Sequence, residues 1–146
     1  MIWFGSGPAF CLGSDLREVG ALQGGAAQRY VQLDFATKNA VAGSTTPVIA
    51  AIQGHCIGAG VELALARDRR IAAPDAIVRF RAVPLGAVPG SAGLRRLPAV
   101  GGRGVATRAL HMACHATHEI DAMPRPAAAS PGLTRRSMMT SLSEQR

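Results

Sequence analysis

One segment, residues 47–68, constrains the fold of this 146-residue chain more than any other. It reads PVIAAIQGHCIGAGVELALARD, so an apolar run breaks into glycines and restarts as an amphipathic helix. The apolar run is typical of a strand buried on both faces of a parallel sheet. A turn from such a strand into a helix gathers the free N–H groups of the first helical turn, where they can stabilise negative charge. The segment therefore predicts a reactive site, with Glu62 in the first turn of the helix.

The segments around this site predict an α/β fold with right-handed crossovers. Residues 48–52 predict a strand, residues 60–67 a helix and residues 70–73 the next strand, which together form a βαβ pattern. Residues 76–83 predict a further extended segment, and residues 94–106 predict a helix after a loop rich in glycine and proline.

A second helix is expected over residues 26–41, upstream of the central segment. The spacing of Tyr30, Leu33, Thr37 and Val41 suits a helix with one buried side. Asp15 is placed to cap an earlier helix. Residues 123–146 show no periodicity, which indicates a disordered tail.

The composition argues against several classes of partner. The net charge is +7, but all except one of the 16 basic residues are arginines spread along the chain, and aromatic residues make up only 4%. A nucleic-acid interface would need a contiguous basic face with interleaved aromatics, so we expect none. No apolar run reaches the length of a membrane span, so no membrane partner is expected. Three cysteines without a CxxC pair favour a reducing compartment, the cytoplasm.

Three ordered segments resemble the crotonase superfamily, which contains the enoyl-CoA hydratases and isomerases. They are residues 5–16 (GSGPAFCLGSDL), residues 47–73 (PVIAAIQGHCIGAGVELALARDRRIAA) and residues 75–102 (DAIVRFRAVPLGAVPGSAGLRRLPAVGG). The resemblance implies a crotonase-like ββα/βαβ spiral that binds acyl-CoA thioesters. It implies no separate cofactor, because coenzyme A is part of the substrate. In this family two backbone N–H groups hold the thioester oxygen as it becomes an enolate.

Carried over residue by residue, the resemblance assigns the two oxyanion donors to the backbone N–H groups of Ser14 and Ala59. Small side chains and flanking glycines at these positions let an acyl group approach closely. Glu62 matches the first of the two glutamates with which hydratases of the family handle water, and it is the candidate catalytic acid or base. The remaining candidates are expected to contact substrate: Ala9, Phe10, Cys11, Leu12, Gly13, Gly58, Gly60 and Gly86.

The second hydratase glutamate corresponds here to Ala82. Adding water to a double bond needs both a base and an acid, and a methyl group supplies neither. The sequence therefore does not predict ordinary hydratase activity, and a one-carboxylate reaction through Glu62, such as thioester hydrolysis or slow hydration, stays open. The alternative is a non-catalytic fragment that binds acyl-CoA or associates with full-length relatives.

The resemblance also sets expectations for domain organisation. Residues 1–112 are expected to form a partial crotonase-like domain, truncated at both ends, and residues 113–146 an unmatched tail. The resemblance implies a trimer, although the helices that build it in the family have no match here.

The sequence predicts neither a metal site nor a nucleophile elbow. His111, Cys114, His115 and His118 lie at helical spacing with Glu119 beside them, but no second ligand pair is present, so no metal site is predicted. Ser91 lies in Gly90-Ser91-Ala92-Gly93, one residue short of a nucleophile elbow.

Overall fold

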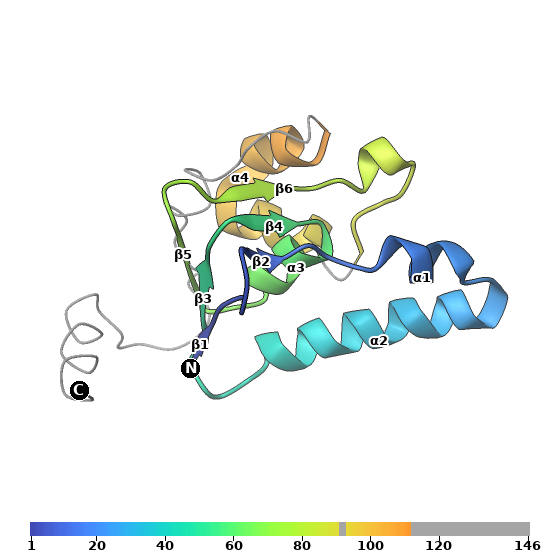
Figure 1. The fold of residues 1–146 in the computed structure, drawn as a ribbon, viewed down its shortest axis with the longest axis horizontal. Helices are drawn as coiled ribbons and strands as arrows, with labels where there is room; N and C mark the ends of the chain where they lie inside the picture. Colours follow the sequence, from blue (N-terminus) through green and yellow to red (C-terminus); the bar gives the residue numbers. More distant parts are fainter. Residues whose placement is uncertain (91–92, 112–146) are drawn as a thin grey trace.

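A computed structural model describes residues 1–90 and 93–111 of the chain. The described part repeats one unit, in which two short strands are followed by helical structure (Figure 1). The first unit contains β1 (Ile2–Trp3), β2 (Ala9–Cys11), α1 (Leu16–Ala21) and α2 (Gly24–Ala42). The second contains β3 (Ile49–Ile52), β4 (His55–Ile57) and α3 (Ala59–Leu65). The third contains β5 (Arg69–Ala72), β6 (Ile77–Arg79), the 3-10 helix η1 (Val83–Leu85) and α4 (Gly93–His111).

The strands form two parallel sheets, and each unit adds one strand to each of them. One sheet has the order β1-β3-β5 and the other the order β2-β4-β6. Ala50 pairs with Arg70 in the first sheet, and Cys56 pairs with Val78 in the second. Because every unit repeats the same step, the chain winds as a spiral with parallel strands, which is the α/β arrangement that the sequence predicts.

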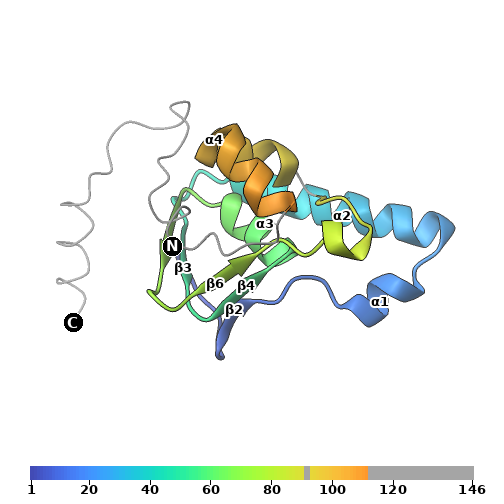
Figure 2. The same cartoon turned by 90° about the horizontal axis from the view of Figure 1, so that it is seen from above.

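Helices α3 and α4 lie on one side of the β2-β4-β6 sheet (Figure 2). The core forms where these helices meet the strands, and Ile52, Cys56, Val61, Phe80 and Leu97 are each at most 2% exposed. Within residues 1–90 and 93–111, no helix combines the length and apolar character that crossing a bilayer requires.

The structure corrects the expected path through the central segment. The sequence suggests that the strand at residues 48–52 turns directly into a helix, whereas β4 lies between them and belongs to the second sheet. Gly54 makes this change of sheet possible, because it has a φ of 53° and the Pro8 carbonyl occupies the space where a side chain would begin.

Helix α2 forms as predicted, but the side turned to the domain agrees only in part with the expected one, since Tyr30 and Val41 are partly buried and the other two residues are not. Leu33 is 69% exposed and Thr37 is also exposed, whereas Lys38 is the one residue of the helix that is fully buried. The N-terminal cap of α1 is confirmed, since the Asp15 carboxylate accepts hydrogen bonds from the N–H groups of Arg17 and Glu18 at 2.8 and 3.3 Å.

Candidate functional site

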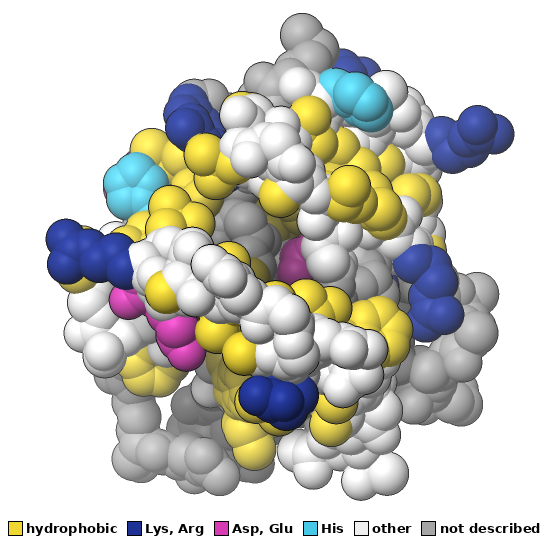
Figure 3. Space-filling view, turned by 90° about the vertical axis from the view of Figure 1, so that its right-hand side faces the viewer, with side chains coloured by type: hydrophobic (Ala, Val, Ile, Leu, Met, Phe, Trp, Pro, Cys, Tyr) yellow, Lys and Arg dark blue, Asp and Glu magenta, His cyan; other side chains and the backbone are white. Residues whose placement is uncertain are grey.

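Three of the singled-out segments follow three neighbouring parallel strands. Gly13 and Ser14 come after β2, Gly58 and Ala59 after β4, and Ala82 after β6. Since the carboxyl ends of parallel strands meet at one edge of a sheet, these segments share one end of the molecule. The face of the molecule on the right of Figure 1 is hollowed, and an acidic side chain is visible inside the hollow (Figure 3).

The loops after β2 and β4 touch each other through glycines. Gly13 has a φ of 93°, and a Cβ there would lie 2.8 Å from the Ile57 carbonyl oxygen and 3.2 Å from the Ala59 nitrogen. Gly60 packs against the backbone and side chain of Cys11 so closely that a Cβ would collide with the Cys11 carbonyl oxygen. Both glycines therefore allow an approach that any larger residue would prevent.

The first turn of α3 leaves backbone N–H groups without acceptors. Gly58 has a φ of 54° and its carbonyl accepts hydrogen bonds from the N–H groups of Val61 and Glu62 at 3.0 and 3.2 Å. Neither the Ala59 N–H nor the Ser14 N–H donates a hydrogen bond to another of the described residues. Free N–H groups at the start of a helix are donors available to an anion or a polarised carbonyl.

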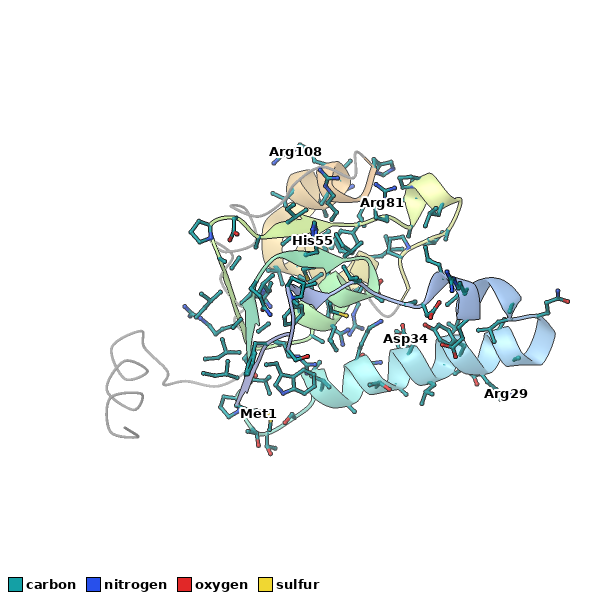
Figure 4. The ribbon with its side chains drawn as sticks, viewed as in Figure 1. Met1, Arg29, Asp34, His55, Arg81 and Arg108 are labelled. Atoms are coloured by element: carbon teal, nitrogen blue, oxygen red, sulfur yellow. The ribbon has the colours of Figure 1, made fainter. Side chains whose placement is uncertain are left out.

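Glu62 lies three residues after Ala59 in α3 and is almost completely buried, with a relative exposure of 4%. Its Oε2 accepts a hydrogen bond from Lys38 Nζ at 3.1 Å. The same Nζ donates to both oxygens of Asp34 at 2.6 and 2.7 Å. Figure 4 shows Asp34 on the side of α2 that faces the sheets. Helix α2 thus brings one cation and one further carboxylate to Glu62.

The two oxygens of Glu62 differ in their surroundings. Oε1 is buried and has no hydrogen-bond partner among the described residues. It faces Gly93 at the start of α4, where a Cβ would lie 2.6 Å from it. Arg96 follows one turn later on α4 and donates to Asn39 Oδ1 at 2.7 Å.

The charge of Glu62 is set by opposing effects. Burial raises the pKa of the Glu62 carboxyl above its ordinary value, because a low-dielectric surrounding disfavours the ionised form. The Lys38 ammonium lowers this pKa by its charge and its hydrogen bond, Asp34 raises it, and Arg96 lowers it. Glu62 is therefore a carboxyl whose proton is held more tightly than usual, although the Lys38 ammonium beside it favours the ionised form.

The other predicted site residues lie in two places, at β2 and at the end of η1. Ala9, Phe10 and Cys11 form β2, and Leu12 follows it with its side chain 66% exposed. Gly86 ends η1 with a φ of 73° and is exposed. The substrate-contact role of both groups stays a prediction.

Sequence reasoning missed Lys38, Asp34 and Gly93. One signal for Lys38 was available, because it is the only lysine in a chain whose other basic residues are arginines. Of the residues considered for metal binding, His111 is the last described one, and Cys114, His115, His118 and Glu119 lie outside the described residues.

Two surface pockets are lined by neither Glu62 nor the Gly58–Gly60 turn. One, of about 140 Å³, is lined in part by Arg67, Arg70 and Arg96, and the other, of about 270 Å³, includes Trp3 and Phe10. The Arg67 guanidinium is 3.2 Å from the centre of the Trp3 ring, and its three nitrogens have no hydrogen-bond partner within the described residues. Burial lowers the pKa of Arg67 to about 10.

Comparisons with known proteins agree with this arrangement. The family model described as enoyl-CoA hydratase/isomerase matches residues 1–123. The chain is 42% identical over 98 residues to a putative enoyl-CoA hydratase/isomerase, YngF, of Bacillus subtilis, covering 67% of the chain and 38% of that relative. It is 41% identical over 106 residues to the probable enoyl-CoA hydratase EchA14 of Mycobacterium tuberculosis, covering 73% of the chain and 41% of that relative.

Solved structures give the same result for the fold. The crystal structure of an enoyl-CoA hydratase from Bacillus anthracis matches with a TM-score of 0.76 and 34% identity, over 82% of this chain and 48% of that one. The expected crotonase-type spiral is thereby confirmed. The chain spans less than half the length of these three proteins.

Proposed function

The chain belongs to the enoyl-CoA hydratase/isomerase family, and from this premise we propose that it binds acyl-CoA thioesters and stabilises their enolate form. In this proposal the N–H groups of Ser14 and Ala59 hold the thioester oxygen, and Glu62 moves the proton at the α-carbon. One observation carries the proposal. The segments after β2 and β4 meet at Gly13 and Ala59, neither proposed donor is bonded to another described residue, and the buried carboxylate of Glu62 lies in the first turn of α3.

The physical argument for the donors is electrostatic. Deprotonation of the α-carbon pushes an electron pair onto the thioester oxygen, so negative charge develops there. Fixed N–H groups aimed at this oxygen stabilise the charge without having to reorganise, and removing one such donor typically costs about 10²–10³ in rate. Glu62 is suited to the proton transfer because its raised pKa brings it nearer to that of the group it deprotonates.

The reaction that follows enolate formation depends on Ala82. This residue lies after β6, at the same end of the sheet, and offers a methyl group where a hydratase of the family has its second glutamate. A single carboxyl can exchange the α-proton, but hydration also needs a second group to manage the water. We therefore expect slow hydration of crotonyl-CoA and measurable exchange of the α-proton of a saturated acyl-CoA.

The test uses a substitution that removes the N–H group of Ala59. Ala59 is the first residue of α3, a position where proline fits because its N–H has no helical partner. We expect Ala59→Pro to lower deuterium exchange from heavy water into butyryl-CoA by about 10²–10³, and Glu62→Gln to abolish it. Ala59→Ser keeps the N–H and should retain most of the exchange.

Hydration of crotonyl-CoA, followed by the loss of the enoyl thioester absorbance, tests the role of Ala82. Ala82→Glu should increase this rate while Glu62→Gln removes it again. Exchange that is equally fast in the wild type, Ala59→Pro and Glu62→Gln would refute the proposed roles of both residues.

Ala82 also favours a second candidate function, the binding of acyl-CoA without catalysis. A chain without the second acid can bind acyl-CoA and release it unchanged. Calorimetric binding of butyryl-CoA, combined with no α-proton exchange in the wild type, would assign this binding role instead.

A further inference from the structure

Lys38 links Glu62 to a second carboxylate, that of Asp34. Its side chain is 5% exposed, and its Nζ contacts Glu62 Oε2 at 3.1 Å and Asp34 Oδ1 at 2.6 Å. A buried ammonium is costly unless it is paired, so its position on α2 is explained by the two carboxylates that it joins. These two carboxylates come from residues 34 and 62, on helices α2 and α3.

The ion pair with Lys38 involves only one of the two carboxylate oxygens of Glu62. Oε2 is held by Lys38, whereas Oε1 is buried without a partner among the described residues and lies against Gly93. An unpaired buried carboxylate oxygen is unfavourable in a resting protein, because desolvation is not compensated. It is also the atom best able to accept a proton, since the other oxygen already shares its charge with a cation.

We propose that Lys38 and Asp34 form a charged clamp that fixes Glu62 through Oε2 and leaves Oε1 as the oxygen that accepts the substrate proton. This inference rests on the proposed acyl-CoA function. In the step concerned, the C–H bond at the α-carbon breaks, its proton forms an O–H bond on Oε1, and the electron pair moves to the thioester oxygen. Lys38 exchanges no proton with the substrate in this step and is a positioning residue, not a catalytic one.

Asp34 has a defined part in the clamp. It shares Nζ with Glu62 and therefore draws the ammonium partly away from Oε2, while its own negative charge opposes ionisation of Glu62. Arg96, on α4, is the other charged group that acts on Glu62, and it favours the ionised form. Removal of Lys38 and removal of Asp34 should consequently shift the titration of Glu62 in opposite directions.

The test can be made on the free protein, without any substrate. The sequence contains four glutamates, so selective ¹³C labelling of the glutamate carboxyls gives a spectrum in which the Glu62 signal is the one lost in Glu62→Gln. We expect the titration midpoint of Glu62 to be higher in Lys38→Met and lower in Asp34→Asn than in the wild type. Arg29→Met is the matched control, because it removes one positive charge from an exposed position nearer the amino-terminal end of α2 (Figure 4). It should leave the midpoint unchanged.

The single lysine supplies a reciprocal measurement. In protein labelled with ¹⁵N-lysine, one Nζ signal is expected, and it should shift at the pH at which Glu62 titrates. This step should vanish in Glu62→Gln and persist in Arg29→Met. If Lys38→Met fails to fold, Asp34→Asn and the Nζ signal carry the test on their own.

The proposed clamp is refuted if the titration midpoint of Glu62 is the same in Lys38→Met, Asp34→Asn and Arg29→Met. It is also refuted if the Nζ signal does not shift at the pH at which Glu62 titrates. The proposed function is tested by a different measurement, since it fails if the wild type shows no α-proton exchange. The titrations do not depend on that result. Where exchange is observed, its pH profile should move upward in Lys38→Met and downward in Asp34→Asn.

Discussion

Gly93→Ala measures directly how closely α4 packs on Glu62. A Cβ at residue 93 would lie 2.6 Å from Glu62 Oε1, 3.0 Å from its Cγ and 3.2 Å from its Cδ. The three nearest atoms all belong to Glu62, whose side chain is fixed by Lys38 and cannot move away freely. Forcing extra volume into such a site costs about 1–3 kcal/mol. An alanine in a helix is favoured over glycine by roughly 0.5–1 kcal/mol, which offsets part of this cost.

We therefore expect Gly93→Ala to lower the free energy of unfolding by about 1–2 kcal/mol. The measurement is urea denaturation followed by far-ultraviolet circular dichroism, with the slope of the transition checked for constancy. Glu62→Ala removes all three contacting atoms, so in that background the same substitution should stabilise the protein by a few tenths of a kcal/mol, up to about 1.

Gly104→Ala provides the control, in the helical part of α4 that follows a kink at Gly102, where φ is 77°. Gly104 is exposed in α4, and a Cβ there would meet no atom within 4 Å. Its replacement should stabilise the protein slightly in both backgrounds, because only helix propensity changes. If Gly93→Ala is equally destabilising with and without Glu62, the loss does not come from the carboxylate and the described packing of Oε1 against α4 is wrong.

Two further predictions concern buried charges. The pKa of Glu62 is raised in the folded state, so between the ordinary glutamate pKa and the raised value the folded protein binds more protons than the unfolded one. As the pH rises through this window, the free energy of unfolding of the wild type should therefore fall relative to that of Glu62→Gln. Equal pH dependence of the two unfolding curves would contradict the raised pKa. Arg67→Met should raise the free energy of unfolding by roughly 1–2 kcal/mol, measured by urea titration of Trp3 fluorescence, because it removes a buried cation whose nitrogens have no acceptor among the described residues. Arg81→Met, at an exposed position, is the control, and a net loss of stability in Arg67→Met would mean that the contact with Trp3 outweighs the desolvation of the guanidinium.

The motif segments could be placed from sequence because parallel strands have a fixed polarity. Residues 58–62 follow the strand at residues 48–52 along the chain, so the sequence places the glycines and Glu62 beyond its carboxyl end, although in the structure they directly follow β4. Strand β4 was missed for a physical reason, since three residues between glycines carry no usable periodicity. It forms because β2 and β6 lie on either side of it and satisfy its backbone groups.

The error on α2 has a different origin. Local spacing assigns Leu33 to the buried side of this helix, yet Leu33 is exposed and the helix turns Lys38 inward. The orientation is consistent with an ion pair to a residue 24 positions later in the chain, which no local pattern encodes. A lysine inside a helix ordinarily indicates a solvated face, so the partner of Lys38 becomes evident only from the three-dimensional structure.

Helix α2 has a consequence for how the molecule would come apart. Among its 19 residues only Lys38 is fully buried, and Val31, Leu33 and Phe35 leave apolar surface in water. An element with so little packing detaches at a lower free energy than the strands do, in a partial opening that leaves the rest folded. Such an opening would separate Glu62 from Lys38 while the sheets stay folded. The ion pair of this carboxylate would therefore be lost at a lower free energy than the fold itself.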